Sequence, residues 1–148
     1  RALWRGDLSF SGRFTSWDGV EAHPRPVSPS GPPIHVGGNS PATFRRAVLQ
    51  ADGWYGFGTT LASTADAREA IRQNLEALGR PADRGRIQVS VTPSEPVDRD
   101  LVRRYEDLDV DRLILVRDFR DTAGGPHSER AAAVLSFLAD IPTALGLD

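Results

Sequence analysis

The sequence predicts an α/β fold built on a parallel sheet, and three observations support that prediction. From Ile34 onward, a short apolar run followed by a segment with helical spacing occurs four times. Two of the runs, "IQVSV" and "LILV", are rich in the aliphatic and β-branched residues of buried strands. No long linker interrupts the region. Strands that alternate with helices in this way predict parallel pairing through right-handed crossovers.

The four expected strands are short apolar runs: "IHV" at 34, "GWYGF" at 53, "RIQVSV" at 86 and "DRLILV" at 111. The first expected helix starts near Pro41, because proline is favoured in the first helical turn. Asn39 or Ser40 is its expected N-cap, since both side chains can accept a hydrogen bond from a free helical N–H group.

Three further helices are expected from apolar residues at helical spacing. In "STADAREAIRQNLEALG", Ser63 or Thr64 is the expected N-cap and Gly79 the expected C-cap. The expected apolar faces are Ala67, Ala70, Ile71, Leu75 and Leu78 in this helix; Val97, Leu101, Val102, Tyr105 and Leu108 in the next; and Ala132, Leu135, Phe137, Leu138 and Ile141 in the last.

Residues 1–33 have a different character. The stretch "LSFSGRFTSW" predicts a small hairpin that turns at Ser11 and Gly12, and the proline-rich "HPRPVSPSGPP" predicts an extended path. The plain interpretation is a surface connection before the first parallel strand. In an α/β enzyme the same segment could also form a wall of the active site.

The composition excludes several classes of function. A formal net charge of -2, with arginines interspersed among carboxylates, argues against a nucleic-acid partner. The absence of cysteine and lysine excludes disulfides, thiolate metal sites and lysine chemistry. No apolar run approaches the ~20 residues that span a bilayer, and no secretion signal is visible, so we expect no membrane association and a cytoplasmic location.

The glycine pair Gly37 and Gly38 is the strongest local signal of a site. It follows the first expected strand and precedes the first expected helix, where ligands bind in parallel α/β folds. Glycines allow close approach of an anion to the backbone, and the helix N-terminus favours negative charge. A tight turn that binds nothing explains the same residues equally well.

Other candidate side chains have competing interpretations. His35 lies mid-strand, where a satisfied histidine is favoured over a catalytic one, and no two histidines have metal-ligand spacing. Trp54 and Tyr55 could border a flat ring system or simply belong to the core. Arg117, followed by Asp118, ends the last expected strand, where it could bind an anionic substrate or cofactor group or form a salt bridge between loops.

Four stretches together resemble the C-terminal half of the luciferase-like flavin and deazaflavin oxidoreductases: "LWRGDLSFSGRF", "PRPVSPSGPPIHVGGNSPATFRRAVLQADGWYGF", "LGRPADRGRIQVSV" and "VDRLILVRDF". They occur in the family's order across nearly the whole chain. The specific part is the glycine pair, the arginine-rich helix behind it and "DGWY" at the family spacing. The sequence departs from the family pattern at Ala51 and Asp109, where glycine is common, and we expect these changes to affect loop conformation more than cofactor choice.

The resemblance implies an eight-stranded (β/α) TIM barrel. Such a barrel takes ~250 residues, so residues 1–148 are expected to form the C-terminal half, with 1–33 as an excursion and 34–148 as about four strand-helix units. In the family the glycine pair binds the phosphate of FMN or of coenzyme F420 through backbone N–H groups. Carried over, Gly37 and Gly38 are phosphate ligands with Asn39 and Ser40 as neighbours. The arginine-rich composition and the closest resemblance favour actinobacterial members that use F420.

The implied activity is hydride transfer or oxygen activation by reduced F420 or FMN on a small organic substrate. The chain opens on "RALWRGD" and shows no recognisable catalytic acid or base, so we expect a fragment that is inactive alone. The alternative is a non-catalytic flavin-binding or structural half-barrel. A half-barrel has two unpaired sheet edges, which predicts a homodimer or association with the missing N-terminal half.

Overall fold

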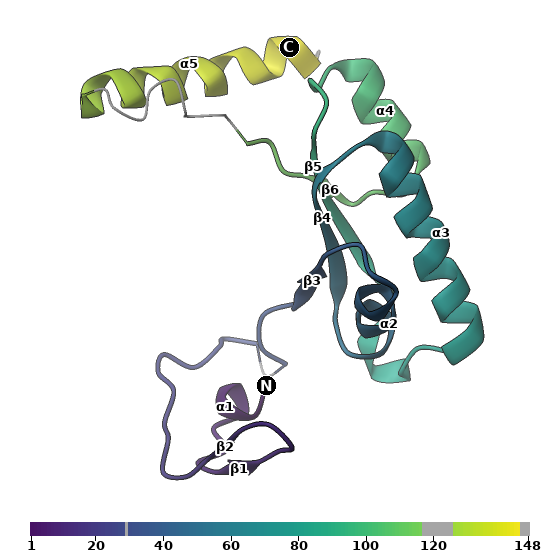
Figure 1. The fold of residues 1–148 in the computed structure, drawn as a ribbon. Coiled ribbons are helices and arrows are strands. Elements are labelled where there is room, and N and C mark those ends of the chain that lie inside the picture. The colour runs from purple at the N-terminus through teal and green to yellow at the C-terminus, as the bar shows by residue number, and fades with distance from the viewer. Residues whose placement is uncertain (29, 117–125, 146–148) are drawn as a thin grey trace. The chain divides into compact units, whose positions relative to one another are not determined.

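The structure, a computed structural model, describes residues 1–28, 30–116 and 126–145. The chain divides into two compact units, Arg1–Ile34 and His35–Asp148. The second unit contains the parallel sheet and the glycine pair, Gly37 and Gly38 (Figure 1).

The smaller unit contains the expected hairpin. A short helix, α1 (Ala2–Arg5), precedes β1 (Phe10–Ser11) and β2 (Ser16–Trp17), which pair antiparallel. The Phe10 and Trp17 rings stack with their centroids 4.7 Å apart. The turn was expected at Ser11 and Gly12, but Ser11 is still in the strand. The turn spans 12–15, where the N–H of Gly12 donates to the carbonyl of Thr15 at 3.0 Å.

The larger unit confirms the parallel α/β prediction. Its four strands lie in the order β3-β4-β5-β6 and all pair parallel: β3 (His35–Gly37), β4 (Gly53–Thr59), β5 (Gln88–Pro93) and β6 (Arg112–Leu113). β6 is shorter than the run "DRLILV" predicted. Ile114 still donates to Val91 at 2.8 Å, but a regular ladder would next need the amide of residue 93, and Pro93 has no N–H.

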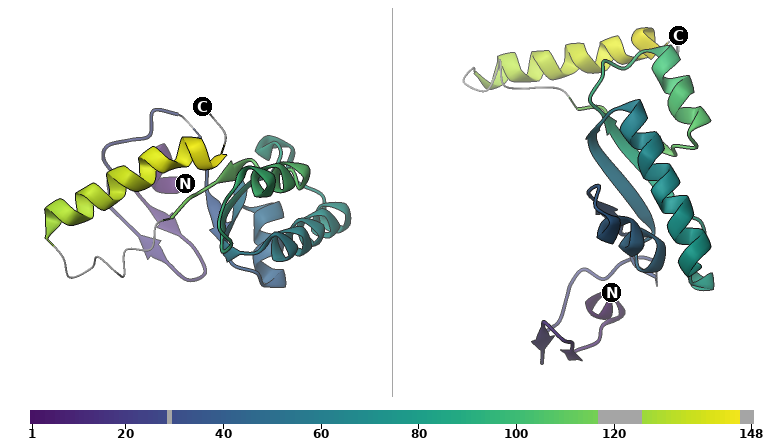
Figure 2. Two further views of the ribbon diagram at one scale, coloured as in Figure 1. Left: turned by 90° about the horizontal axis from the view of Figure 1, so that it is seen from above. Right: turned by 45° about the vertical axis from the view of Figure 1, so that its right-hand side comes forward.

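Three helices cover one face of this sheet: α2 (Pro41–Leu49), α3 (Leu61–Leu78) and α4 (Arg99–Asp107) (Figures 1 and 2). A short turn of 3₁₀ helix, η1 (Ala82–Arg84), lies between α3 and β5. The core forms between these layers, and its buried members are Phe44, Ala47, Val48, Trp54, Ala67, Ile71, Ile87, Val89, Val91, Leu101 and Tyr105.

The start of α3 differs from the expectation of a cap at Ser63 or Thr64. The N-cap is Thr60, whose hydroxyl accepts from the Ser63 N–H at 3.1 Å while the Ser63 hydroxyl accepts from the Thr60 N–H at 2.9 Å. This reciprocal capping box starts the helix earlier than a single cap at Ser63 would. At the other end, Gly79 is the C-cap as predicted, although Leu78 of the predicted face is exposed.

The last helix, α5 (His127–Leu145), confirms the expected apolar face only in part, because Ala132, Leu135 and Leu138 of that face are exposed. Leu135 and Leu138 are 67% and 54% exposed. Phe137 and Ile141 are half-buried as expected, and Val134, which was not predicted, is half-buried with them. Alanine and leucine occur on several sides of this helix, so its sequence does not select one apolar stripe. Of the helices that the structure describes, none is both long and apolar enough to span a membrane.

Asp109 and Ala51, the two positions where glycine is common in the resembled family, differ in backbone conformation. Asp109 has a φ of 56°, a left-handed conformation that glycine adopts freely and aspartate tolerates. Its carboxylate binds the guanidinium of Arg68 at 2.7 Å, which ties the loop after α4 to α3. Ala51 is buried and lies in none of the left-handed positions, so an alanine is accommodated there without strain.

Candidate functional site

The loops at the two ends of the parallel strands have different roles. We call the segments that follow the strands, at 38–40, 60, 94–98 and 114–116, the carboxyl rim. The segments that lead into the strands, at 50–52, 79–87 and 108–111, form the amino rim. Ligands of parallel α/β proteins bind at the carboxyl rim, and the glycine pair lies there.

The loop from Gly37 to Ser40 presents free backbone donors. Gly37 is the last residue of β3, and Ser40 caps α2 by accepting from the Thr43 N–H at 3.2 Å, which confirms one of the two expected caps. Within the described chain, no group accepts from the N–H of Gly38, Asn39, Ser40 or Ala42. All four residues are exposed. The loop therefore offers four amide donors to a ligand at a helix N-terminus.

The N-terminus of α2 also differs electrostatically from its neighbours at the carboxyl rim. A carboxylate oxygen of Glu95 accepts from the first amide of α3, that of Leu61, at 3.3 Å. α4 is capped by Asp98 and has Asp100 in its first turn. α2 has a neutral cap and no acid in its first turn. Since only its positive end lacks a nearby carboxylate among these three helices, it is the one best suited to an anion.

The two glycines meet different requirements. Gly38 has a φ of 109°, a conformation that side-chain-bearing residues rarely adopt. A Cβ added at Gly37 would have as its nearest neighbour the carbonyl oxygen of Tyr55 at 3.6 Å, an ordinary contact. The fold of the described chain therefore explains a glycine at 38 and does not itself require one at 37.

The sheet face opposite the three helices is polar and partly open. Strand register places Gly37 beside Tyr55 on this face. The Tyr55 hydroxyl is hydrogen-bonded to that of Thr92 at 2.7 Å, and the Arg112 guanidinium donates to the Ser90 hydroxyl at 3.4 Å. Tyr55 thus presents a planar ring next to the glycine loop, whereas Trp54 points to the other face and is fully buried, as the core interpretation predicted.

His35 lies at the far end of the same face. It pairs with Gly53 at the amino ends of β3 and β4, and its Nε2 is 3.1 Å from the amide oxygen of Gln88. The side chain is half-buried and hydrogen-bonded, which supports the satisfied-histidine interpretation. This position separates it from the carboxyl rim.

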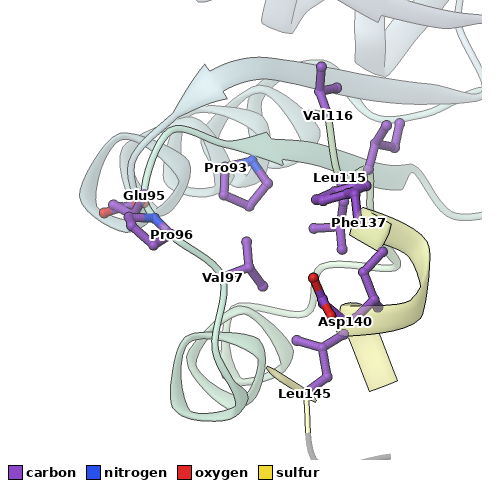
Figure 3. Close-up of a pocket in the computed structure, with 11 residues that line it drawn as sticks. Pro93, Glu95, Pro96, Val97, Leu115, Val116, Phe137, Asp140 and Leu145 are labelled. Atoms are coloured by element: carbon purple, nitrogen blue, oxygen red, sulfur yellow. The ribbon is translucent and has the colours of Figure 1, made fainter. Parts of the chain in front are cut away.

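A hollow lies at the carboxyl ends of β5 and β6, where it is closed on one side by α5 (Figure 3). It has a volume of about 250 Å³. Its lining is mostly apolar, with two carboxylates, Glu95 and Asp140; the apolar members include Pro93, Val97, Leu115, Phe137, Ile141 and Leu145. Such a lining suits the apolar part of a small organic molecule.

Tyr105 is a buried core residue whose hydroxyl lies near Glu95, one of the residues that line this hollow. Burial, followed by the charge of Glu95, raises the pKa of Tyr105 above its usual range, so the phenol stays protonated. Its hydroxyl donates to the Thr59 carbonyl at 3.3 Å and lies 3.4 Å from a Glu95 carboxylate oxygen. Glu95 therefore accepts from the first amide of α3, and it competes with the Thr59 carbonyl for the single hydroxyl proton of Tyr105. Arg117 and Asp118, the other candidates at this rim, lie outside the described residues.

One hydrogen bond of the site, made by Trp54, was not predicted from the sequence. The indole N–H of Trp54 donates to the carbonyl of Gly38 at 2.8 Å. Nothing local to either residue indicates this bond, since the two are 16 positions apart. The only available signal was the family spacing between the glycine pair and "DGWY".

Comparisons with known proteins agree with this fold. The family model described as luciferase-like monooxygenase matches residues 1–137. Among solved structures, an F420-dependent secondary alcohol dehydrogenase, in complex with an F420-acetone adduct, matches with a TM-score of 0.53 at 10% sequence identity. The match covers 77% of this chain and 52% of that one, so the chain spans about half the length of that enzyme. The search of curated proteins returned no match.

Proposed function

Because the chain belongs to the luciferase-like monooxygenase family, we propose that it supplies the phosphate-binding end of a flavin-type cofactor site in an oxidoreductase. The fold is shown to be a partial barrel of that family, with four parallel strands. The proposed cofactor is reduced coenzyme F420 or FMN, which supplies a hydride or activates oxygen when bound. The substrate is a small organic molecule.

One observation carries the proposal: four unpaired amide donors at the one carboxylate-free helix N-terminus among α2, α3 and α4. In the bound state, the amides of Gly38, Asn39 and Ser40 donate to phosphate oxygens. Gly37 leaves room for the ligand beside Tyr55. Arg46 lies on the same turn of α2, with its guanidinium 3.4 Å from the Thr43 hydroxyl, and adds positive charge near the loop.

F420 is the first choice of cofactor and FMN the second. The named function of the matching dehydrogenase supports F420 by analogy. Both cofactors carry a phosphate ester, and the donors described above serve either. The apolar hollow beside α5 is the proposed place for the apolar part of the substrate, and Arg117 is the proposed contact for an anionic group of substrate or cofactor.

The decisive test compares each cofactor with its phosphate-free form in the protein expressed from its complete gene. Fluorescence quenching gives the affinities for F420 and its dephosphorylated deazaflavin core, and for FMN and riboflavin. We expect micromolar binding of F420 or FMN and a loss of about tenfold or more without the phosphate. Absence of binding, or equal affinity with and without phosphate, contradicts the proposal.

A second candidate is a protein that holds the cofactor without turning it over. The observation in its favour is that the hydroxyl and imidazole groups of Tyr55, Thr92, Ser90 and His35 are all hydrogen-bonded within the described sheet face. Each of these groups already has a partner in the protein, so none stands out from the others as the group that would exchange a proton with a substrate. Steady consumption of reduced cofactor with a small alcohol, ketone or aldehyde excludes this candidate.

We also propose that the sheet is completed by further strands. Among the described strands, β3 and β6 each have a neighbour on one side only. The occupants would be the other half of a barrel or a second copy of this chain. Sedimentation as a compact monomer of residues 1–148 contradicts this proposal.

A further inference from the structure

Trp54 is the link between the core and the glycine loop. Its side chain is fully buried, and its ring packs against Phe44 of α2 with centroids 6.1 Å apart. Its one polar atom, the indole Nε1, donates to the carbonyl oxygen of Gly38 at 2.8 Å. A partly buried bond of this length, made by a fully buried side chain, holds the Gly38 carbonyl toward the core.

Gly56 makes this placement of the indole possible. A Cβ at position 56 would lie 2.5 Å from the indole Cη2 atom and 3.1 Å from Cζ2. The ring therefore lies over the space left by a missing side chain in its own strand. This accounts for the spacing of "GWYG", in which the second glycine follows the tryptophan by two positions on the same face of β4.

The bond to Gly38 determines where the next amide points. In a trans peptide, the carbonyl of one residue and the N–H of the following residue point in opposite directions. With the Gly38 carbonyl directed into the core by Trp54, the N–H of Asn39 is directed outward from the loop. That N–H is one of the four donors without a partner in the described chain.

We propose that Trp54 is a positioning residue of the phosphate site: it fixes the Gly38–Asn39 peptide plane so that the Asn39 N–H faces the bound phosphate. This inference rests on the proposed function, because it assumes that a phosphate ester binds at the loop. It adds that a residue buried in the core, without contact to the ligand, sets part of the affinity.

The test is the Trp54→Phe variant of the complete protein, compared with Val48→Ala. Both remove packing from the same core, but only the first removes a donor. We expect Trp54→Phe to weaken F420 or FMN binding by about five- to tenfold, the worth of one hydrogen bond. The phosphate-free core of the same cofactor should bind with unchanged affinity. Val48→Ala should lower stability without changing either affinity by more than about twofold.

The outcomes separate this inference from the function on which it rests. If the unaltered protein binds no phosphorylated cofactor, both fail. If it binds and Trp54→Phe binds equally well, or loses affinity equally for both forms of the cofactor, only the positioning role fails. Should Trp54→Phe not fold, the unaltered protein still decides by NMR: titration with the phosphorylated cofactor must shift the Asn39 amide proton, and an unmoved proton overturns the inference.

Discussion

The two ends of α2 differ in whether the rest of the molecule supplies hydrogen-bond partners to their backbone groups. At its C-terminus, the Arg80 guanidinium donates to three carbonyls and Arg84 donates to a fourth; the acceptors are Ala47, Val48, Ala51 and Gln50, at 2.7 to 3.0 Å. At its N-terminus, four amides have no acceptor in the described chain. The protein itself supplies partners at one end, and at the other end we propose that a ligand does.

The contrast extends along both rims of the sheet. The amino rim holds further bonded pairs between arginines and carboxylates, among them Arg86 with Asp111 and Arg68 with Asp109. The carboxyl rim holds the neutral glycine loop. We therefore propose that the amino ends of the strands serve stability and the carboxyl ends serve binding, as is general for barrels of this type. Variants at the amino rim should therefore change stability and leave cofactor affinity alone.

The largest effect is expected for Arg80→Met, which keeps the aliphatic stem and removes every donor. The freed carbonyls at the C-terminus of α2 should cost about 3 kcal/mol in the free energy of unfolding, measured by urea denaturation. Arg84→Met removes one such bond and should cost about 1 kcal/mol. If the loss of cofactor-binding free energy in either variant exceeds its loss of unfolding free energy, the proposal that the amino rim serves stability and the carboxyl rim serves binding is wrong.

A smaller loss is expected for Asp111→Ala. The Asp111 carboxylate accepts from the Val89 N–H at 2.7 Å, and Val89 is fully buried. Leaving that amide unpaired should cost about 2 kcal/mol of unfolding free energy. Asp111→Asn retains an acceptor oxygen and should lose less.

The same residue makes a pH-dependent contribution. Burial works to raise the pKa of Asp111, but the Val89 N–H and the Arg86 guanidinium outweigh it and hold the pKa below its ordinary value of 3.8. A lowered pKa in the folded state stabilises the fold at pH values above the unfolded pKa, from about pH 5 upward. The contribution is lost as the pH falls through 3.8 and below. As the pH is lowered, the unfolding free energy of Asp111→Ala should thus fall less steeply than that of the unaltered protein. Parallel curves of unfolding free energy against pH for the two proteins would refute this.

A still smaller effect is expected at Asp109. Asp109→Ala places a less tolerant residue in the left-handed conformation and removes the bond to Arg68, which should cost about 1 kcal/mol of unfolding free energy. Asp109→Gly adopts the left-handed conformation without strain and loses only the ion pair with Arg68. Thermal denaturation should therefore rank the unaltered protein first, the glycine variant second and the alanine variant last.

The smallest effect is expected for Arg72→Ala on the exposed side of α3. The Arg72 hydrogen bond, aided by Gln73, lowers the pKa of Glu69 from 4.5 to about 2. Because both side chains are solvated, we expect the melting temperature to stay unchanged within error. NMR titration should nevertheless show the pKa of Glu69 returning toward 4.5. A clear loss of stability would mean that exposed ion pairs on a helix contribute as much to the unfolding free energy as the interactions of the amino rim.

Local signals in the sequence were sufficient for much of this description. The alternation of strands and helices, the cap at Ser40 and the C-cap at Gly79 depend on neighbouring residues, and the structure confirms them. The glycine loop was also identified, with its occupant left open between an anion and nothing. Its role in binding remains a proposal.

Signals that depend on contacts between distant residues were not available. Arg80 bonds to carbonyls up to 33 positions away, and it was not singled out among the arginines. The cap of α3 was misplaced because Thr60 and Ser63 were both suitable. The predicted buried face of α5 was wrong at Ala132, Leu135 and Leu138, since apolar residues surround this helix and only tertiary packing selects among them.

The central claim is that the carboxyl rim at the glycine loop binds a phosphate ester, and Gly37→Ala tests it most directly. A methyl group at this position meets no described atom closer than 3.6 Å, so the free energy of unfolding should change by less than about 0.5 kcal/mol. The dissociation constant for F420 or FMN should rise by about tenfold or more, because the methyl group occupies the side on which the ligand approaches. Unchanged affinity in a normally folded Gly37→Ala variant would contradict the account.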